Sequence, residues 1–135
     1  MKKILVAEDS APNRNIICQL LKKLGFEVVD VENGKRAMEA IENAENSGFA
    51  FDAIYSDIMM PEMGGMEFLE KIREKSSYDN VPFVFITALT DKEQIIKAKS
   101  LNVKGYLLKP VSLDKVLKKS KELFPDHKFP ILSVA

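Results

Sequence analysis

The sequence predicts an α/β fold: a doubly wound, five-stranded parallel sheet in the order 2-1-3-4-5, with helices on both faces. Two observations lead to this expectation. Short apolar runs alternate along the chain with segments whose apolar residues recur at helical spacing. Strands separated by helices pair in parallel, and a sheet that is covered on both faces must reverse its winding once.

Five apolar runs supply the strands. They are Ile4–Ala7, Phe26–Val31, Ala53–Ser56, Phe83–Thr87 and Gly105–Leu108. All are rich in Val, Ile, Phe or Tyr, which is typical of strands buried on both faces. The strand order places the second run at the outer edge. Ligands of such sheets bind beyond the carboxyl ends of the strands, at the switch between strands 1 and 3.

Helical segments follow the strands. The first three apolar stripes are Ile17, Leu20, Leu21, Leu24, then Ala37, Ala40, Ile41, Ala44, then Met66, Leu69, Ile72. Pro12 lies near the first turn of the first helix and Gly25 just past its end, where these residues are favoured. Thr90-Asp91-Lys92-Glu93 matches a capping box before a short fourth helix. The last helix is expected to begin after Ser112, a candidate N-cap.

Composition excludes several classes of protein. The 135 residues are 46% apolar and 30% charged, as in soluble globular domains. No apolar run approaches the roughly 20 residues that span a bilayer, so we expect no membrane insertion. The single Cys18 excludes an internal disulfide and favours a cytoplasmic location. The lone His127, which we expect to be exposed in the tail, lies far from the single cysteine. The sequence therefore offers no His/Cys metal cluster, and any metal must be a hard cation held by oxygen.

Charge is unevenly spread along the chain. Residues 1–90 carry 10 Lys and Arg against 15 Asp and Glu, a net charge of −5, whereas residues 91–135 carry 10 Lys against 5 acids, a net charge of +5. Solvated helix faces are the simpler explanation, and an acidic partner of the basic part is the alternative. The basic part has no arginine and no aromatic residues interleaved with its lysines, so we expect no direct nucleic-acid binding.

Polar residues stand at the carboxyl ends of four predicted strands. Glu8 and Asp9 follow strand 1, Asp57 follows strand 3, Thr87 ends strand 4 and Lys109 follows strand 5. Taken singly, these residues have simpler explanations: a helix cap, an Asx-turn, a strand residue and a surface turn. Their joint position at four neighbouring strand ends favours a functional site.

The chemistry of this set suggests phosphoryl transfer. Three crowded carboxylates raise one another's pKa, and a divalent cation such as Mg²⁺ removes the repulsion. A lysine and a hydroxyl group beside them suit phosphoryl oxygens. An aspartate in such surroundings can accept a phosphoryl group, because this reaction needs positioning and charge neutralisation more than proton transfer.

The motifs "ILVAEDS", "YSDIMMPEMGG", "FVFITAL" and "GYLLKPV" resemble those of the receiver domain of two-component response regulators, in the stand-alone, chemotaxis-type form. The resemblance covers roughly residues 2 to 123 and implies the flavodoxin-like version of the predicted fold. It further implies a receiver domain over residues 1–124 and a short tail over 125–135, with no effector domain.

The resemblance also implies a role for each site residue. Asp57 would be the phosphoacceptor, and Thr87 and Lys109 the catalytic residues that hold the phosphoryl oxygens. The metal would be Mg²⁺, with ligands or water-mediated contacts from Glu8, Asp9, Asp57 and the backbone carbonyl of Met59. Thr87 and Tyr106 would form the switch, and the Lys109–Pro110 bond would be cis.

By the same resemblance, the protein is not an enzyme but a phosphoacceptor that assists its own phosphorylation and dephosphorylation. Its partners would be a histidine kinase or a histidine phosphotransfer protein, and a separate output protein that reads helix 4, strand 5 and helix 5. We expect a monomer or weak dimer. One alternative is a pseudo-receiver, an interaction module that is not phosphorylated. A hydrolase of the haloacid dehalogenase type is disfavoured, because Met59 stands where those enzymes carry a second aspartate.

Overall fold

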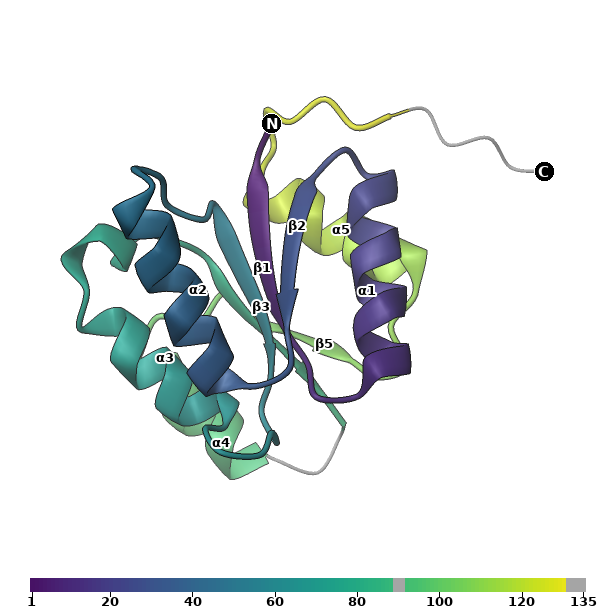
Figure 1. The fold of residues 1–135 in the computed structure, drawn as a ribbon. Coiled ribbons are helices and arrows are strands. Elements are labelled where there is room, and N and C mark those ends of the chain that lie inside the picture. The colour runs from purple at the N-terminus through teal and green to yellow at the C-terminus, as the bar shows by residue number, and fades with distance from the viewer. Residues whose placement is uncertain (89–91, 131–135) are drawn as a thin grey trace.

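The computed structural model describes residues 1–88 and 92–130, in which strands and helices alternate (Figure 1). The strands are β1 (Lys3–Ala7), β2 (Glu27–Val31), β3 (Ala53–Asp57), β4 (Phe83–Thr87) and β5 (Tyr106–Leu108). The helices are α1 (Ala11–Lys23), α2 (Gly34–Asn46), α3 (Gly65–Arg73), the 3-10 helix η1 (Ser76–Tyr78), α4 (Lys92–Lys99) and α5 (Leu113–Leu123). The expected capping residues Thr90 and Asp91 lie outside the described part.

The five strands form one parallel sheet in the order β2-β1-β3-β4-β5, which confirms the predicted topology. Helices α1 and α5 cover one face, and α2, α3 and α4 cover the other (Figure 1). Ala7, the last residue of β1, pairs with Ser56 on β3. The chain therefore leaves β1 and β3 at adjacent points, and the residues that follow meet at one edge of the sheet.

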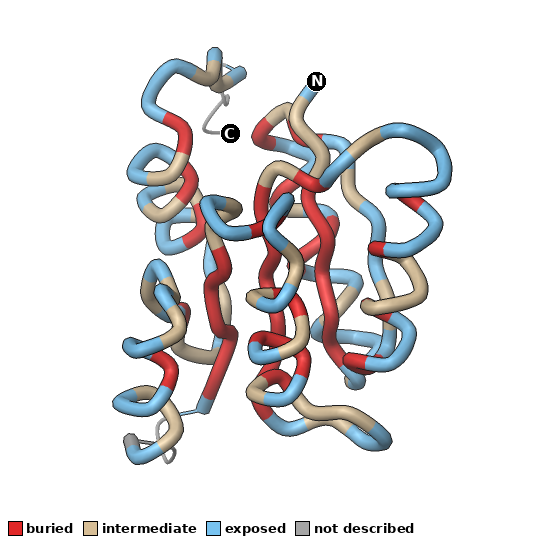
Figure 2. The backbone as a smooth tube through the Cα atoms, turned by 90° about the vertical axis from the view of Figure 1, so that its left-hand side faces the viewer, coloured by how far each residue is buried: buried red, intermediate tan, exposed pale blue. Residues whose placement is uncertain are grey.

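Each face of the sheet has its own apolar core. Ile54 and Phe83 contribute to the core beneath α2, α3 and α4, and Tyr55 and Val84 to the core beneath α1 and α5. Strands β1, β3 and β4 are buried on both faces and run through the centre of the molecule (Figure 2). This alternation of side chains between two cores explains why these strands lack a polar face.

Strand β2 departs from the expectation of five buried strands. Its side chains are half-buried or exposed, and Val29 is 38% exposed. The reason is its position at the edge, where only β1 pairs with it.

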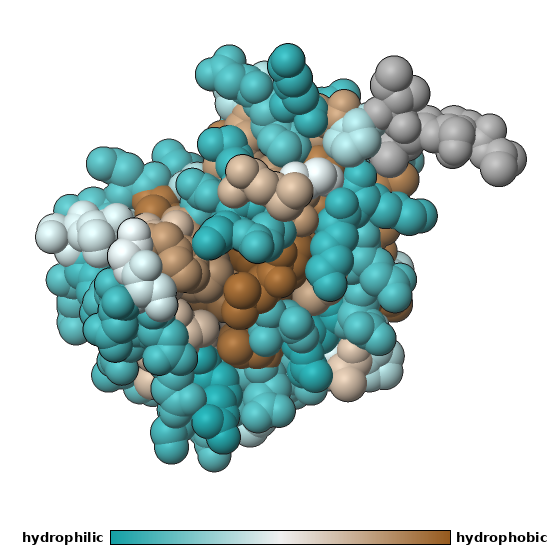
Figure 3. Space-filling view, turned by 45° about the horizontal axis from the view of Figure 1, so that its top comes forward, coloured by the Kyte–Doolittle hydropathy of each residue, from teal (hydrophilic) through white to brown (hydrophobic). Residues whose placement is uncertain are grey.

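Viewed with the amino-terminal end tilted forward, the molecule shows apolar surface in a hollow between hydrophilic side chains (Figure 3).

The helix ends largely follow the sequence signals. Ser112 caps α5 by accepting a hydrogen bond from the backbone N–H of Lys115, as predicted. Pro12 lies in the first turn of α1, and Gly25, just after that helix, has a φ of +90°, a conformation that favours glycine. In α3, Phe68 joins the predicted Leu69 and Ile72 in the buried stripe.

The expectation that His127 is exposed was wrong. Its ring is half-buried and stacks on Phe26, with ring centroids 4.4 Å apart and an interplanar angle of 18°. Its Nε2 atom lies 2.8 Å from the carbonyl oxygen of Leu24. The segment after α5 therefore packs against the amino-terminal end of the sheet.

Among the described residues, no helix has the length and apolar character needed to cross a membrane.

Candidate functional site

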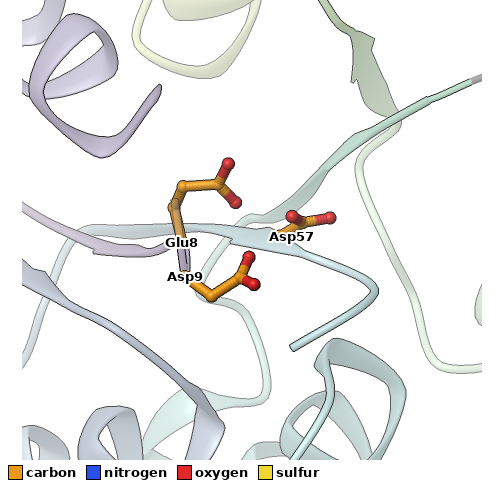
Figure 4. Close-up of side chains that lie close together, drawn as sticks. All are labelled: Glu8, Asp9 and Asp57. Carbon is orange, nitrogen blue, oxygen red and sulfur yellow. The ribbon is translucent and has the colours of Figure 1, made fainter. Parts of the chain in front are cut away.

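Three carboxylates converge where β1 and β3 end. One oxygen from each of Glu8, Asp9 and Asp57 lies within 4.8 Å of the others, and the Glu8 and Asp9 carboxylates point toward Asp57 (Figure 4). Glu8 is fully buried, Asp57 is 6% exposed and Asp9 is exposed. Asp57 is the last residue of β3 and Glu8 follows β1 directly, so the topology of the sheet creates this cluster.

Lys109 joins the cluster from the end of β5. Its Nζ donates to Glu8 Oε1 at 2.9 Å and to Asp57 Oδ2 at 2.8 Å. The Lys109–Pro110 peptide bond is cis, which confirms that expectation. A single ammonium group thus bridges two buried carboxylates that come from different strands.

The electrostatics reflect this crowding. Burial, together with the neighbouring Asp57, raises the pKa of Glu8 to about 7, although Lys109 opposes the shift. Burial lowers the pKa of Lys109, but its hydrogen bonds to Asp57 and Glu8 outweigh this effect and leave the pKa raised. One positive charge therefore only partly compensates the acidic cluster.

The local backbone fixes the position of Asp57. Its Oδ1 accepts hydrogen bonds from the backbone N–H groups of Ile58 at 2.7 Å and Met59 at 3.4 Å. The Asx-turn considered from the sequence is therefore present, and Oδ2 still contacts Lys109. Gly65 begins α3 so close to this turn that a Cβ atom there would collide with the Asp57 carbonyl. A Cβ atom at Gly64 would in turn lie only 2.9 Å from the carbonyl oxygen of Ile58, so both glycines at the end of "YSDIMMPEMGG" permit a close backbone approach.

The two expected switch residues lie on β4 and β5, and in the described part of the chain neither is hydrogen-bonded to the carboxylates of the cluster. Thr87 is buried at the end of β4, and its hydroxyl donates to the carbonyl oxygen of Ala88 at 2.8 Å. Tyr106, on the neighbouring strand β5, is 46% exposed. The side chain of Met59 is 64% exposed, beside the turn that holds Asp57.

Two supporting residues were not predicted. Ser10, rather than Glu8 or Asp9, caps α1 by accepting from the backbone N–H of Asn13 at 3.4 Å. Arg14 donates to the carbonyl oxygen of Glu8 at 2.9 Å and holds the loop that carries both acids. A Ser before Ala-Pro is a recognisable capping signal, whereas a side-chain bond to a backbone carbonyl leaves no trace in the sequence.

The site fits a hard divalent cation. Oε2 of Glu8 is buried and has no hydrogen-bond partner among the described residues. A buried carboxyl oxygen without a partner is unfavourable, and a cation would satisfy it. The available donors are carboxylate oxygens, which suit Mg²⁺ better than softer metals.

Comparisons with known proteins agree with this geometry. The family model described as "Response regulator receiver domain" matches residues 4–121. The chain is 34% identical to chemotaxis protein CheY1 of Helicobacter pylori, over 90% of this chain and 94% of that protein. It is 33% identical to hybrid signal transduction histidine kinase I of Dictyostelium discoideum, over 82% of this chain and 6% of that protein.

A solved structure gives the same result. The chemotaxis protein CheY4 of Vibrio cholerae superposes with a TM-score of 0.79 and 32% sequence identity, covering 91% of this chain and 98% of that chain. The family match extends over both sheet edges and every residue of the acidic cluster. The chain belongs to the response regulator receiver domain family.

Proposed function

We propose that this receiver domain is a signalling switch in which Asp57 accepts a phosphoryl group from a phosphohistidine. The observation that carries the proposal is the contact of Asp57 with Lys109 inside a buried acidic cluster. In the transfer, a carboxylate oxygen of Asp57 forms a bond to phosphorus while the phosphorus–nitrogen bond breaks. The electron pair of that bond returns to the imidazole of the donor. The donor would be a histidine kinase or a histidine phosphotransfer protein, meeting this domain in the cytoplasm.

Mg²⁺ would be held by Glu8, Asp9, Asp57 and the carbonyl oxygen of Met59. When bound, it neutralises charge on the carboxylates and on the phosphoryl oxygens. Lys109 already stands at Asp57 and would contact a phosphoryl oxygen. The Thr87 hydroxyl would have to exchange its bond to Ala88 for one to the phosphoryl group. That exchange would make Thr87 the first moving part of the switch.

The output would be a change of the α4–β5–α5 surface, formed by Lys92–Lys99, Tyr106–Leu108 and Leu113–Leu123. A pocket of about 320 Å³ on this surface is lined by Tyr106, Leu107, Leu108, Lys115, Lys118, Lys119 and Glu122. Its three lysines, of which Lys119 is paired with Glu122, would suit an acidic output protein. Phosphorylation would bias the exposed Tyr106 and this surface toward one of two arrangements.

The test of the acceptor is the variant Asp57→Asn. Purified protein is incubated with a small acyl phosphate and Mg²⁺, and intact mass and acid or base lability of the adduct are measured. Wild type should gain one labile phosphoryl group and Asp57→Asn none. The matched control is Asp52→Asn, just before the other end of β3, which keeps an oxygen that can accept from the N–H of Lys3 and should be phosphorylated normally.

The alternative is a pseudo-receiver that binds partners without phosphorylation. Equal uptake in wild type and Asp57→Asn would refute the proposed acceptor. No uptake in either, from an acyl phosphate and from a phosphorylated histidine kinase alike, would favour the pseudo-receiver.

A further inference from the structure

We infer that Arg73 is a positioning residue that anchors the carboxyl-terminal end of α4, so that the response to phosphorylation is confined to the amino-terminal part of that helix. The inference rests on the proposed function and concerns how the switch moves. It assigns a pivot to one end of α4 and motion to the other.

Arg73, the last residue of α3, ties together two loops that are distant in sequence. Its Nε donates to the carbonyl oxygen of Leu101 at 2.9 Å, and its second terminal nitrogen donates to that of Asn102 at 3.1 Å. Its first terminal nitrogen donates to the carbonyl oxygens of Tyr78 at 2.6 Å and Val81 at 3.0 Å. One guanidinium therefore joins the segment before β4 to the turn that follows α4.

These bonds are the main compensation for the charge of Arg73. No carboxylate forms an ion pair with it within residues 1–88 and 92–130. Burial lowers its pKa, and Asp79 opposes this only by a longer-range interaction. A partly buried cation that relies on backbone carbonyls holds those carbonyls firmly, because losing them would leave its charge uncompensated.

The two ends of α4 also differ in packing, and the carboxyl-terminal end, next to the turn that Arg73 contacts, is the more buried one. Among residues 93–99, Ala98 is fully buried, whereas Ile96 is 67% exposed. Leu101 and Val103, just beyond the helix, are half-buried against the core. Ser100 closes the same end with a bond from its hydroxyl to the carbonyl oxygen of Lys97 at 2.8 Å. The carboxyl-terminal end is thus anchored by packing and by hydrogen bonds.

The opposite end of α4 lies on the connection from β4, whose last residue is Thr87. In the part of α4 that the structure describes, this half contributes only the partly buried Ile95 to the core. The ion pair of Lys97 with Glu70, at 3.6 Å between exposed side chains, adds little. A displacement that starts at Thr87 would therefore tilt the helix about the end that Arg73 holds.

Amide hydrogen exchange read by mass spectrometry tests this arrangement. Wild type is compared with and without beryllium fluoride, a phosphoryl analogue, in Mg²⁺. Exchange in residues 92–96 should change, while exchange in 98–104 should not. In Arg73→Met without the analogue, residues 98–104 should exchange about tenfold faster or more, because charge-assisted hydrogen bonds are lost there. With the analogue, the change should then spread over the whole of α4.

Two controls separate anchoring from general stability. Arg36→Met removes an exposed guanidinium that pairs with Glu39 on α2 and should leave α4 unchanged. Arg73→Lys keeps the charge with fewer donors and should give an intermediate effect, which also secures the test if Arg73→Met folds poorly. Equal acceleration throughout β1, β3 and α4 in both Arg73 variants would overturn the inference.

A wild-type response that already includes residues 98–104 would overturn it as well. Failure of the proposed function has a different signature. If the analogue left residues 53–59 unchanged in wild type, phosphoryl acceptance at Asp57 would be refuted. The comparison without the analogue would still decide whether Arg73 holds this end of α4.

Discussion

The two ends of the sheet are built on opposite principles. At the carboxyl end, Glu8 and Asp57 are buried charges that share one lysine, and an oxygen of Glu8 has no partner among the described residues. At the amino end, Phe26 packs against Phe124 at 5.6 Å and against His127 at 4.4 Å between ring centroids. One end carries unfavourable electrostatics and the other carries ordinary apolar packing.

This difference separates the residues that act from those that stabilise. Sites that bind charged ligands keep polar groups in arrangements that are unfavourable until the ligand arrives. Contacts elsewhere in the domain supply the stability that offsets the cost of such a site. We therefore expect variants at the amino end to change stability without changing the cation response, and variants at the carboxyl end to do the reverse.

The largest expected effect is that of Phe26→Ala. The side chain is 3% exposed and also contacts Phe129, so its removal should lower the free energy of unfolding by about 3–5 kcal/mol. Urea unfolding without Mg²⁺ measures the loss in the free energy of unfolding, and unfolding with Mg²⁺ measures the increase in that free energy that the cation provides. The increment should equal that of wild type, and a reduced increment would show that the two ends are coupled.

The second effect is the response to Mg²⁺ itself. A cation that binds only the native state should stabilise wild type by about 2.7 kcal/mol at a concentration of 100 times its Kd. Asp9→Ala should remove most of this gain, because the exposed Asp9 carboxylate completes the cluster and makes few other contacts. Asp126→Ala, at the amino end, is the matched control and should respond as wild type does. A flat response of wild type to millimolar Mg²⁺ would contradict the cation site.

The same contrast explains what the sequence could predict. The positions of Glu8, Asp9, Asp57 and Lys109 were predictable because parallel topology brings the carboxyl ends of strands together, and the strands are plain apolar runs. Their convergence thus follows from the order β2-β1-β3-β4-β5 alone.

Other contacts had no signal that sequence reasoning could use. Arg14 and Arg73 bond to backbone carbonyls, which every residue possesses, so nothing in the sequence marks their partners. His127 contacts Leu24, which is 103 positions away, and no helical or strand periodicity links the two. Half-burial of β2 follows from its place at the edge rather than from its composition.

A smaller effect is expected from His127 at the amino end of the sheet. His127→Ala should lower the free energy of unfolding by about 1–2 kcal/mol, because it loses both the stacking on Phe26 and the bond to the Leu24 carbonyl. His127→Phe keeps a ring and should lose about half as much. Chemical unfolding of both variants measures this, and two equal losses would show that the ring stacking contributes nothing.

The smallest effect concerns the lysine at the amino end. Lys2 Nζ lies 5.0 Å from the centroid of the Phe124 ring, a cation–π contact at the surface. Such contacts contribute about 0.5–1 kcal/mol, so Lys2→Met should lower stability by no more than that. A double-mutant cycle with Phe124→Leu isolates the coupling energy between the two side chains. A coupling energy near zero would show that this contact does not stabilise the fold. The loss should be the same with and without Mg²⁺, since Lys2 faces an uncharged ring at the end of the sheet opposite the acidic cluster. Lys109→Met provides the contrast, because that lysine contacts the carboxylates directly and its removal should make stability depend more strongly on the cation.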